Sequence, residues 1–153
     1  MTKIGIFGAN GRMGRNLIQA TVDHEQAELS AALVREGSPF DGMDTGLIAG
    51  IGETGVKASS DAKAVSEQAQ VWVEFTLPEA LEQHIDYCVQ HSLNMVVGVT
   101  GLSPELQAKL EQAAEHIAIV FAANFSTGVN LMYKLLELTS KTIGEECDIE
   151  IIE

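Results

Sequence analysis

Three evenly spaced glycines, Gly8, Gly11 and Gly14, stand where a short apolar run gives way to a segment with apolar residues at helical spacing. This GxxGxxG spacing is a variant of the glycine pattern that joins a buried strand to a helix. We expect Gly8 to permit the turn out of the strand, Gly11 to let a ligand approach the backbone, and Gly14 to bring the helix close. Unpaired N–H groups and the positive dipole end at the start of such a helix favour phosphate. The pattern therefore predicts a site for the pyrophosphate of NAD or NADP, formed by Gly8, Ala9, Asn10, Gly11, Arg12 and Met13.

The loops that follow the other expected strands suit the rest of such a ligand. In an open α/β sheet a ligand lies beyond the carboxyl ends of the strands, so these loops meet at one edge. Their residues are small, expose backbone groups or offer hydrogen bonds, as a ribose and a nicotinamide require. The further candidates are Arg35 after the second strand, Phe75 and Thr76 after the third, Gly98, Val99 and Thr100 after the fourth, and Ala122, Ala123, Asn124 and Phe125 after the fifth.

The end of the second expected strand bears on which cofactor is preferred. A site selective for NAD has a carboxylate there, which accepts hydrogen bonds from the ribose 2′-OH. This chain instead has Val34, which cannot accept them, and Arg35, which can pair with a 2′-phosphate. We therefore expect NADPH to be preferred over NADH, or at least not to be discriminated against. Glu36 is the alternative, because its carboxylate could turn toward the ribose.

Few residues outside these loops indicate chemistry. Glu74 lies inside an expected strand, and we interpret it as a strand-end carboxylate bonded to neighbouring backbone N–H groups rather than as a catalytic group. No zinc, P-loop or nucleophile-elbow motif is found, so we predict no metal site. The four histidines fall on expected helices or at their ends, in no metal-ligand or triad spacing; they are His24, His84, His91 and His116.

Composition and charge narrow the class of protein. The chain has 153 residues and a formal net charge of −13, which disfavours nucleic acid as a partner because phosphates demand a basic surface. All three arginines nevertheless lie in the first 35 residues, around the glycine loop, which indicates a small anionic ligand. No apolar run approaches the roughly 20 residues of a membrane span. With no signal peptide expected, and Cys88 and Cys147 expected to be reduced, the sequence favours a cytoplasmic protein.

Short apolar runs alternate with helical patterns along the chain. Such runs suit strands buried on both faces of a parallel sheet; they are Lys3–Phe7, Ala27–Val34, Val71–Phe75, Met95–Val99 and Ile117–Ala123. Helical spacing is found in Met13, Leu17, Ile18 and Val22, in Leu81, Ile85, Cys88 and Val89 after Pro78, and in Leu106, Leu110 and Ala113 after Ser103-Pro104. This alternation predicts an α/β fold, a doubly wound Rossmann sheet of parallel strands with helices on both faces.

Two stretches depart from this alternation. Glu36–Ser60 is rich in glycine, and we expect a long flexible connection with little regular structure. From Thr127 to Ile143 a helical pattern returns, with Gly144 expected to end it. Asp148–Glu153 then alternates like the opening of a strand. A strand without partners is prone to associate, so we expect the isolated chain to associate or fray there.

The segments GANGRMGR, AALVREGS, VEFTLPE, VVGVTG, IVFAANFSTGVN and DIEIIE resemble, in this order and spacing, those of dihydrodipicolinate reductase, an enzyme of the diaminopimelate route to lysine. The resemblance covers the whole chain. It implies reduction of a cyclic imine-type dicarboxylate to tetrahydrodipicolinate by NADPH or NADH, with the cofactor held by the loop residues named above. It also implies a dinucleotide-binding domain over residues 1–126, and a first helix and strand of a substrate-binding and oligomerisation domain over residues 127–153. The complete protein is expected to be a homotetramer.

The chain departs from the family pattern at three points. Many members have an acidic residue at the position of Val34, and their use of both cofactors is often tied to it. Val99 replaces a hydroxyl of the family's GTTG, which we expect to be tolerated because the backbone contacts the ligand. The sequence ends at Glu153, before the family's histidine-rich motif and PSGT loop. The general acid and the cations that bind substrate therefore have no counterpart, and we expect no catalytic residue and no reductase activity in this chain alone.

Two alternatives stay open at this point. The chain could be a stand-alone NAD(P)-binding module that catalyses nothing. It could also be a different Rossmann dehydrogenase, of the homoserine or aspartate-semialdehyde type, although the segment AANFSTGVN disfavours that class.

Overall fold

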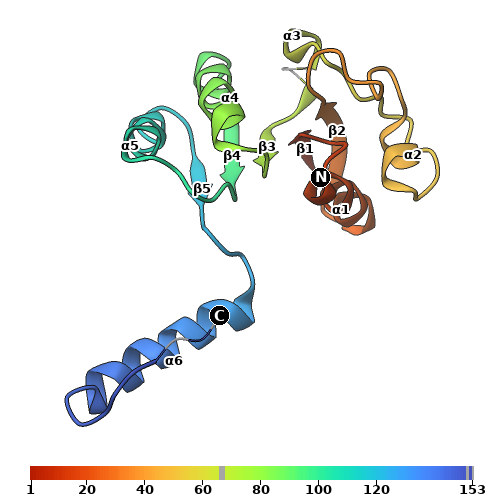
Figure 1. Ribbon diagram of the computed structural model, residues 1–153. Helices are drawn as coiled ribbons and strands as arrows, with labels where there is room; N and C mark the ends of the chain where they lie inside the picture. The colour runs from red at the N-terminus through yellow and green to blue at the C-terminus, as the bar shows by residue number, and fades with distance from the viewer. Residues whose placement is uncertain (66–67, 151, 153) are drawn as a thin grey trace. The chain divides into compact units, whose positions relative to one another are not determined.

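The computed structural model describes residues 1–65, 68–150 and 152. They form two compact units, Met1–Phe121 and Ala122–Glu153. The first unit is built on a parallel sheet of five strands in the order β2-β1-β3-β4-β5 (Figure 1). The strands are β1 (Thr2–Phe7), β2 (Ala27–Leu33), β3 (Val71–Glu74), β4 (Asn94–Val97) and β5 (Ile119–Phe121). The five strands predicted for the sheet are therefore confirmed.

The helices of the first unit cover both faces of this sheet. They are α1 (Arg12–Asp23), α2 (Thr45–Ala49), α3 (Ala62–Val65), α4 (Pro78–Gln90) and α5 (Pro104–Ala113). Neighbouring residues of a strand point to opposite faces. Accordingly Ile6 packs in one core with Ile18 of α1, whereas Phe7 packs in a second core with Leu81 of α4 and Leu110 of α5. Two cores on two faces confirm the predicted doubly wound fold.

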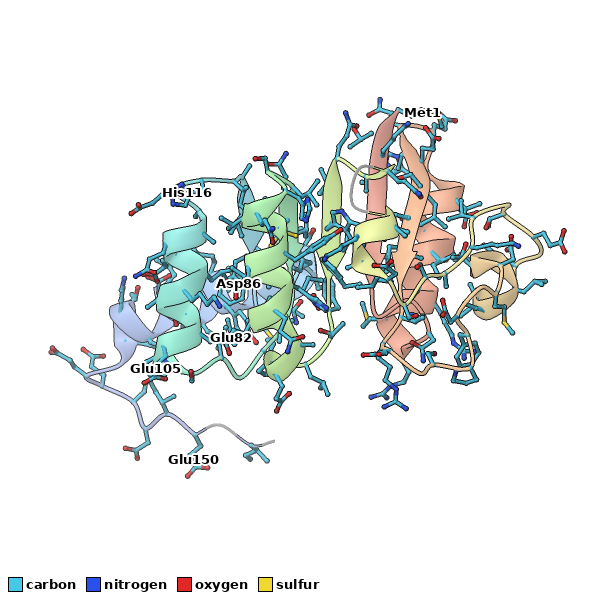
Figure 2. All side chains as sticks on the ribbon, turned by 90° about the horizontal axis from the view of Figure 1, so that it is seen from above. Met1, Glu82, Asp86, Glu105, His116 and Glu150 are labelled. Carbon is cyan, nitrogen blue, oxygen red and sulfur yellow. The ribbon has the colours of Figure 1, made fainter. Side chains whose placement is uncertain are left out.

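Helices α4 and α5 lie side by side on their face of the sheet (Figures 1 and 2). Each begins where predicted, α4 with Pro78 and α5 with Pro104 in its first turn. The Ser103 hydroxyl accepts a hydrogen bond from the Leu106 N–H, as a helix cap does. Between the two helices, Lys109 pairs with Asp86 at 2.7 Å and with Glu82 at 3.4 Å, the two acids labelled on α4 in Figure 2.

The face that α1 turns inward agrees only in part with the prediction. Ile18 is buried and Leu17 packs half-buried against the same core, as predicted, whereas Met13 and Val22 are exposed. The other buried residues of the helix are Gly14 and Thr21. Gly14 determines which side of α1 is buried, because it must face the loop that leaves β1. Residues four and seven positions later then share the inward side. Thr21 fits there because its hydroxyl donates to the Leu17 carbonyl at 2.7 Å.

The glycine-rich stretch between β2 and α3 is more organised than we predicted. It contains α2 and two isolated β-bridges, Leu33 with Ser59 and Asp44 with Lys57. The Asp44 carboxylate accepts hydrogen bonds from the N–H groups of Gly46, Thr54 and Gly55. A connection tied together by one carboxylate in this way is not the loosely structured segment that its glycine content suggested.

At the other edge of the sheet, β5 is not buried on both faces as its apolar run predicted. Val120 and Phe121 are exposed although they point to opposite faces, so neither face is fully covered at β5. Among the described residues β5 pairs only with β4. No helix within the described parts of the chain is long and apolar enough to cross a membrane.

The second unit consists mainly of the predicted helix, α6 (Thr127–Ile143), capped by the Ser126 hydroxyl. Gly144 follows it as expected, but with φ −63° and not in the left-handed conformation typical of a glycine stop. No described residue of α6 is buried. The predicted strand from Asp148 is not found over residues 148–150, which have no regular structure, and positions 151 and 153 lie outside the described residues.

Candidate functional site: a cavity at the switch point of the sheet

The first unit contains a cavity of about 810 Å³ beyond the carboxyl ends of β1, β2 and β3. The strand order reverses here, because the chain leaves β1 toward β2 on one side and returns to β3 on the other. In open α/β sheets this switch point is the usual place of the ligand. The glycine loop, the residues after β2, the residues after β3 and one side of α4 line the cavity.

The glycine loop has the geometry that its spacing predicted. Gly8 has φ +66°, the left-handed region that favours glycine. A Cβ on Gly14 would lie 2.8 Å from the Cα of Ala9, so only glycine lets α1 start this close to the loop. The Ala9 N–H donates to the Leu33 carbonyl at 3.0 Å, which ties the loop to the end of β2. The loop is therefore held firmly on both sides.

The start of α1 faces this cavity with backbone N–H groups. The first N–H groups of a helix have no partner within the helix. The cap residue is Gly11, and no described side chain caps α1. Arg12, the first residue of the helix, and Met13 line the cavity beside it. Polarised N–H groups next to a guanidinium make a suitable site for a phosphate.

The three arginines take different positions. Arg12, at the start of α1, and Arg35, after β2, both line the cavity. Arg15 instead donates from Nε to the Asn10 carbonyl at 3.2 Å and lies over the ring of Phe40 at 5.8 Å. Arg15 thus braces the glycine loop, and Arg12 and Arg35 are the two guanidinium groups available to an anionic ligand in the cavity.

The residues after β2 form the adjoining wall. Val34 is buried, and its N–H donates to the Ser59 carbonyl at 2.9 Å. Arg35 and Glu36 follow it as exposed lining residues. Ser60 also lines the cavity, with its hydroxyl on the Asp41 carboxylate at 2.7 Å, and this contact lowers the pKa of Asp41. The wall therefore offers one cation and one acid to a ligand.

The loop after β3 adjoins a pair of side chains, Glu74 and His84, that was not predicted from the sequence. Glu74 is fully buried, and its carboxylate accepts a hydrogen bond from the Thr76 N–H at 2.7 Å, which confirms the predicted strand-end role. Its second oxygen pairs with Nδ1 of His84, for which no role was predicted. The His84 ring stacks on Phe7, with centroids 4.0 Å apart, and lines the cavity.

A signal for His84 was present in the spacing of α4. Four cavity-lining residues of α4, Ala80, Gln83, His84 and Tyr87, follow one another at intervals of three, one and three. Such spacing places residues on one side of a helix. These residues form a second set on one side of α4, next to its buried residues, and this spacing could have predicted that His84 faces a site.

The predicted site residues fall into three groups. Eight of them line the cavity together: Gly8, Asn10, Gly11, Arg12, Met13, Arg35, Phe75 and Thr76. Four others belong to the first unit but are not among its lining residues: Ala9, Gly98, Val99 and Thr100. Ala9 and Val99 are buried, and Gly98 packs closely against the ring of Phe75. The last four, Ala122, Ala123, Asn124 and Phe125, begin the second unit.

Comparison with known proteins identifies the family and the fold. Residues 2–125 match the family model described as the N-terminus of dihydrodipicolinate reductase. A dipicolinate-bound dihydrodipicolinate reductase from Paenisporosarcina sp. TG-14 is similar in structure, with a TM-score of 0.71 and 23% identity over 93% of this chain and 54% of that one. This chain thus spans about half the length of that reductase.

Other dehydrogenases share the fold at lower similarity. An amine dehydrogenase from Mycobacterium smegmatis gives a TM-score of 0.60 with 29% identity, over 74% of this chain and 36% of that one. An aspartate semialdehyde dehydrogenase with NADP from Candida albicans gives 0.57 with 16% identity, over 78% and 42%. The family match extends over most of the sequence, whereas these neighbours share the fold. The chain therefore belongs to the dihydrodipicolinate reductase family.

Proposed function

We propose that this chain binds a nicotinamide dinucleotide in the cavity and forms the cofactor half of a reductase acting on a cyclic imine-type dicarboxylate. The observation that carries the proposal is the cavity at the switch point, lined by the glycine loop, the start of α1 and two guanidinium groups. Structures of the same fold are described with NADP and with NAD. When bound, such a cofactor supplies a hydride for reduction of the substrate.

The residues of the cavity fit such a ligand. The glycine loop and the N–H groups at the start of α1 would hold the pyrophosphate, with Arg12 neutralising its charge. The Thr76 hydroxyl lines the cavity and is buried without a hydrogen-bond partner among the described residues. A buried polar atom without a partner is costly, and a polar group of the ligand would satisfy it. Phe75 offers an aromatic face beside it.

We further propose a preference for NADPH. Val34 is buried and apolar, so it cannot bond to a ribose 2′-OH, and Arg35 lies next to it in the cavity wall. A guanidinium–phosphate contact is a charge-assisted hydrogen bond, stronger than a neutral one. The 2′-phosphate of NADPH would gain this contact, and the uncharged 2′-OH of NADH would not.

Dissociation constants for NADPH and NADH test both statements. Loss of a hydrogen bond to a charged group costs about 1.5–3 kcal/mol, so Arg35→Ala should weaken NADPH binding about 10- to 100-fold and leave NADH binding nearly unchanged. Lys57→Ala removes the same charge from an exposed residue outside this cavity and serves as the control. NADH binding that is tighter than NADPH binding and indifferent to Arg35→Ala would refute the preference.

The substrate, the tetramer and the domain division at residue 126 belong to the same proposal for the complete protein. Turnover requires groups that contact the substrate, and the sequence offers no candidate for them in this chain. We therefore expect cofactor binding without reductase activity from the 153-residue chain. Any reduction of the imine substrate by this chain alone would contradict that expectation.

A further inference from the structure

Glu74 is an unusual residue to find beneath a site for an anionic ligand. Its side chain is 0% exposed, and a buried carboxylate is costly unless hydrogen bonds and an opposite charge compensate it. Its two oxygens have different partners, the Thr76 N–H on one and Nδ1 of His84 on the other. Both partners line the cavity. One buried group is thus joined to two parts of the cavity wall.

We propose that Glu74 is a positioning residue of this cavity, which orients His84 and Thr76 toward the bound cofactor. This inference rests on the proposed function of the cavity and assigns to that site a residue that cannot itself touch the ligand. Glu74 is well placed for such a role, because it is the last residue of β3 and its own carbonyl accepts a hydrogen bond from the Gly98 N–H at 2.9 Å. Its backbone is therefore held by the sheet and by the loop after β4.

The first consequence concerns the His84 ring. A carboxylate accepts hydrogen bonds, so its contact holds a ring hydrogen on Nδ1. Phe7 fixes the plane of the ring, because the two rings stack with an angle of 11°. The side chain of His84 is 18% exposed. The nitrogen that remains for a ligand in the cavity is Nε2, and Glu74 determines which ring nitrogen that is.

The second consequence concerns Thr76. Its N–H is engaged by Glu74, which fixes the backbone of the loop between β3 and α4. Its hydroxyl then stays at the cavity, where it has no partner among the residues that the structure describes. Without the Glu74 contact, this loop would lose a hydrogen bond that holds its backbone, on which the position of the hydroxyl depends.

A purely structural role for Glu74, as a pin between β3 and α4, is the competing explanation. Two substitutions separate the roles. Glu74→Gln keeps an oxygen for the Thr76 N–H, but its amide N–H donates to Nδ1 and so moves the ring hydrogen to Nε2. His84→Asn keeps a donor where Nδ1 was and removes Nε2. Glu79→Gln removes a charge from an exposed position in the first turn of α4 and is the matched control.

The affinity for NADPH of these variants of the 153-residue chain tests the inference. Each substitution removes the hydrogen bond between the His84 ring and the ligand, which is worth about 1 kcal/mol. Glu74→Gln and His84→Asn should therefore each weaken NADPH binding about 3- to 10-fold. Glu79→Gln should bind like the wild type. Because both substitutions act on one contact, the double variant should bind no more weakly than His84→Asn within about twofold, whereas independent effects would multiply.

A measurement without ligand accompanies the affinities. The ¹⁵N spectrum of the histidine side chains in the wild-type chain should show the hydrogen of His84 on Nδ1, and in Glu74→Gln on Nε2. If Glu74→Gln does not fold, the wild-type spectrum together with the affinity of His84→Asn still tests the inference. A wild-type ring without a hydrogen on Nδ1 overturns the inference.

The outcomes for this inference and for the proposed function are distinguishable. Wild-type chain that binds neither NADPH nor NADH overturns the proposed function, and the inference with it. Wild-type binding that Glu74→Gln leaves unchanged overturns the inference alone. Weaker binding with additive losses in the double variant also overturns it, because Glu74 would then not act through His84.

Discussion

Replacement of Gly8 by alanine tests how the glycine loop is held. The residue has φ +66°, and an added Cβ would lie 2.6 Å from Cγ2 of Thr76. A left-handed conformation costs a residue other than glycine about 1–2 kcal/mol, and overpacking adds about 1–3 kcal/mol. Thr76 cannot relieve the contact cheaply, because its stiff β-branched side chain would have to turn its buried hydroxyl as well.

Gly37 provides the matched control for this substitution. It has φ +72°, and an added Cβ would have no atom within 4 Å. Gly37→Ala should therefore lose only the backbone part, about 1–2 kcal/mol, and Gly8→Ala about 2–5 kcal/mol when the overpacking is included. The two losses are measured by urea denaturation of the two variants under identical conditions.

The affinity for NADPH, measured on the same variants, adds a second readout. Gly8 lines the cavity and Gly37 does not, so only Gly8→Ala should weaken binding. Equal losses of stability in the two variants would show that the contact with Thr76 does not constrain the loop. Unchanged affinity in a folded Gly8→Ala variant would show that the ligand does not depend on this turn.

Two further predictions concern the rest of the first unit. Hydrogen bonds from backbone N–H groups, above all that of Thr54, hold the pKa of Asp44 below its ordinary value of 3.8. The ionised carboxylate therefore stabilises the fold above pH 3.8, and this stabilisation is lost as the pH falls through the lower pKa of the folded state. Asp44→Asn should cost about 1 kcal/mol at neutral pH, and a gap to wild type that does not narrow on acidification would contradict the assignment. Burial, and then the charge of Glu74, raise the pKa of the Cys88 thiol to about 12. Cys147 is exposed, so it alone should react with a thiol reagent in the folded chain, and labelling of Cys88 without denaturant would refute this.

The strands were predictable from sequence because a strand buried on both faces leaves a short, continuous apolar run. The same argument failed at β5, where Val120 and Phe121 are exposed although the strand has the same apolar composition. It also failed in part at α1, where the inward side is set by the close approach of Gly14 and not by the apolar residues. Local pattern gives the type of element, and contacts across the sheet decide which side is buried.

The candidate site shows the same division. The glycine loop is contiguous in sequence and has a known spacing, so its place beside the cavity followed from the residues alone. The pair of Glu74 with His84 joins a strand end to the middle of a helix ten residues later, in no motif. The organisation of the loop around Asp44 was equally hidden, because it depends on N–H groups that come together only when the chain folds.

The chain is proposed to bind an anion although its formal net charge is −13. Exposed charges act over roughly 8 Å at physiological ionic strength, so the groups nearest the ligand decide the local potential. Two cations, Arg12 and Arg35, line the cavity, and Glu36 is the one exposed acid among its lining residues.

The other acids near the cavity have partners of their own. The carboxylate of Glu74 is buried and paired with His84, which limits its effect on a ligand. The acidic residues labelled on α4 in Figure 2, Glu82 and Asp86, are not lining residues and face Lys109 instead. The cavity can therefore attract an anion although the chain as a whole repels it.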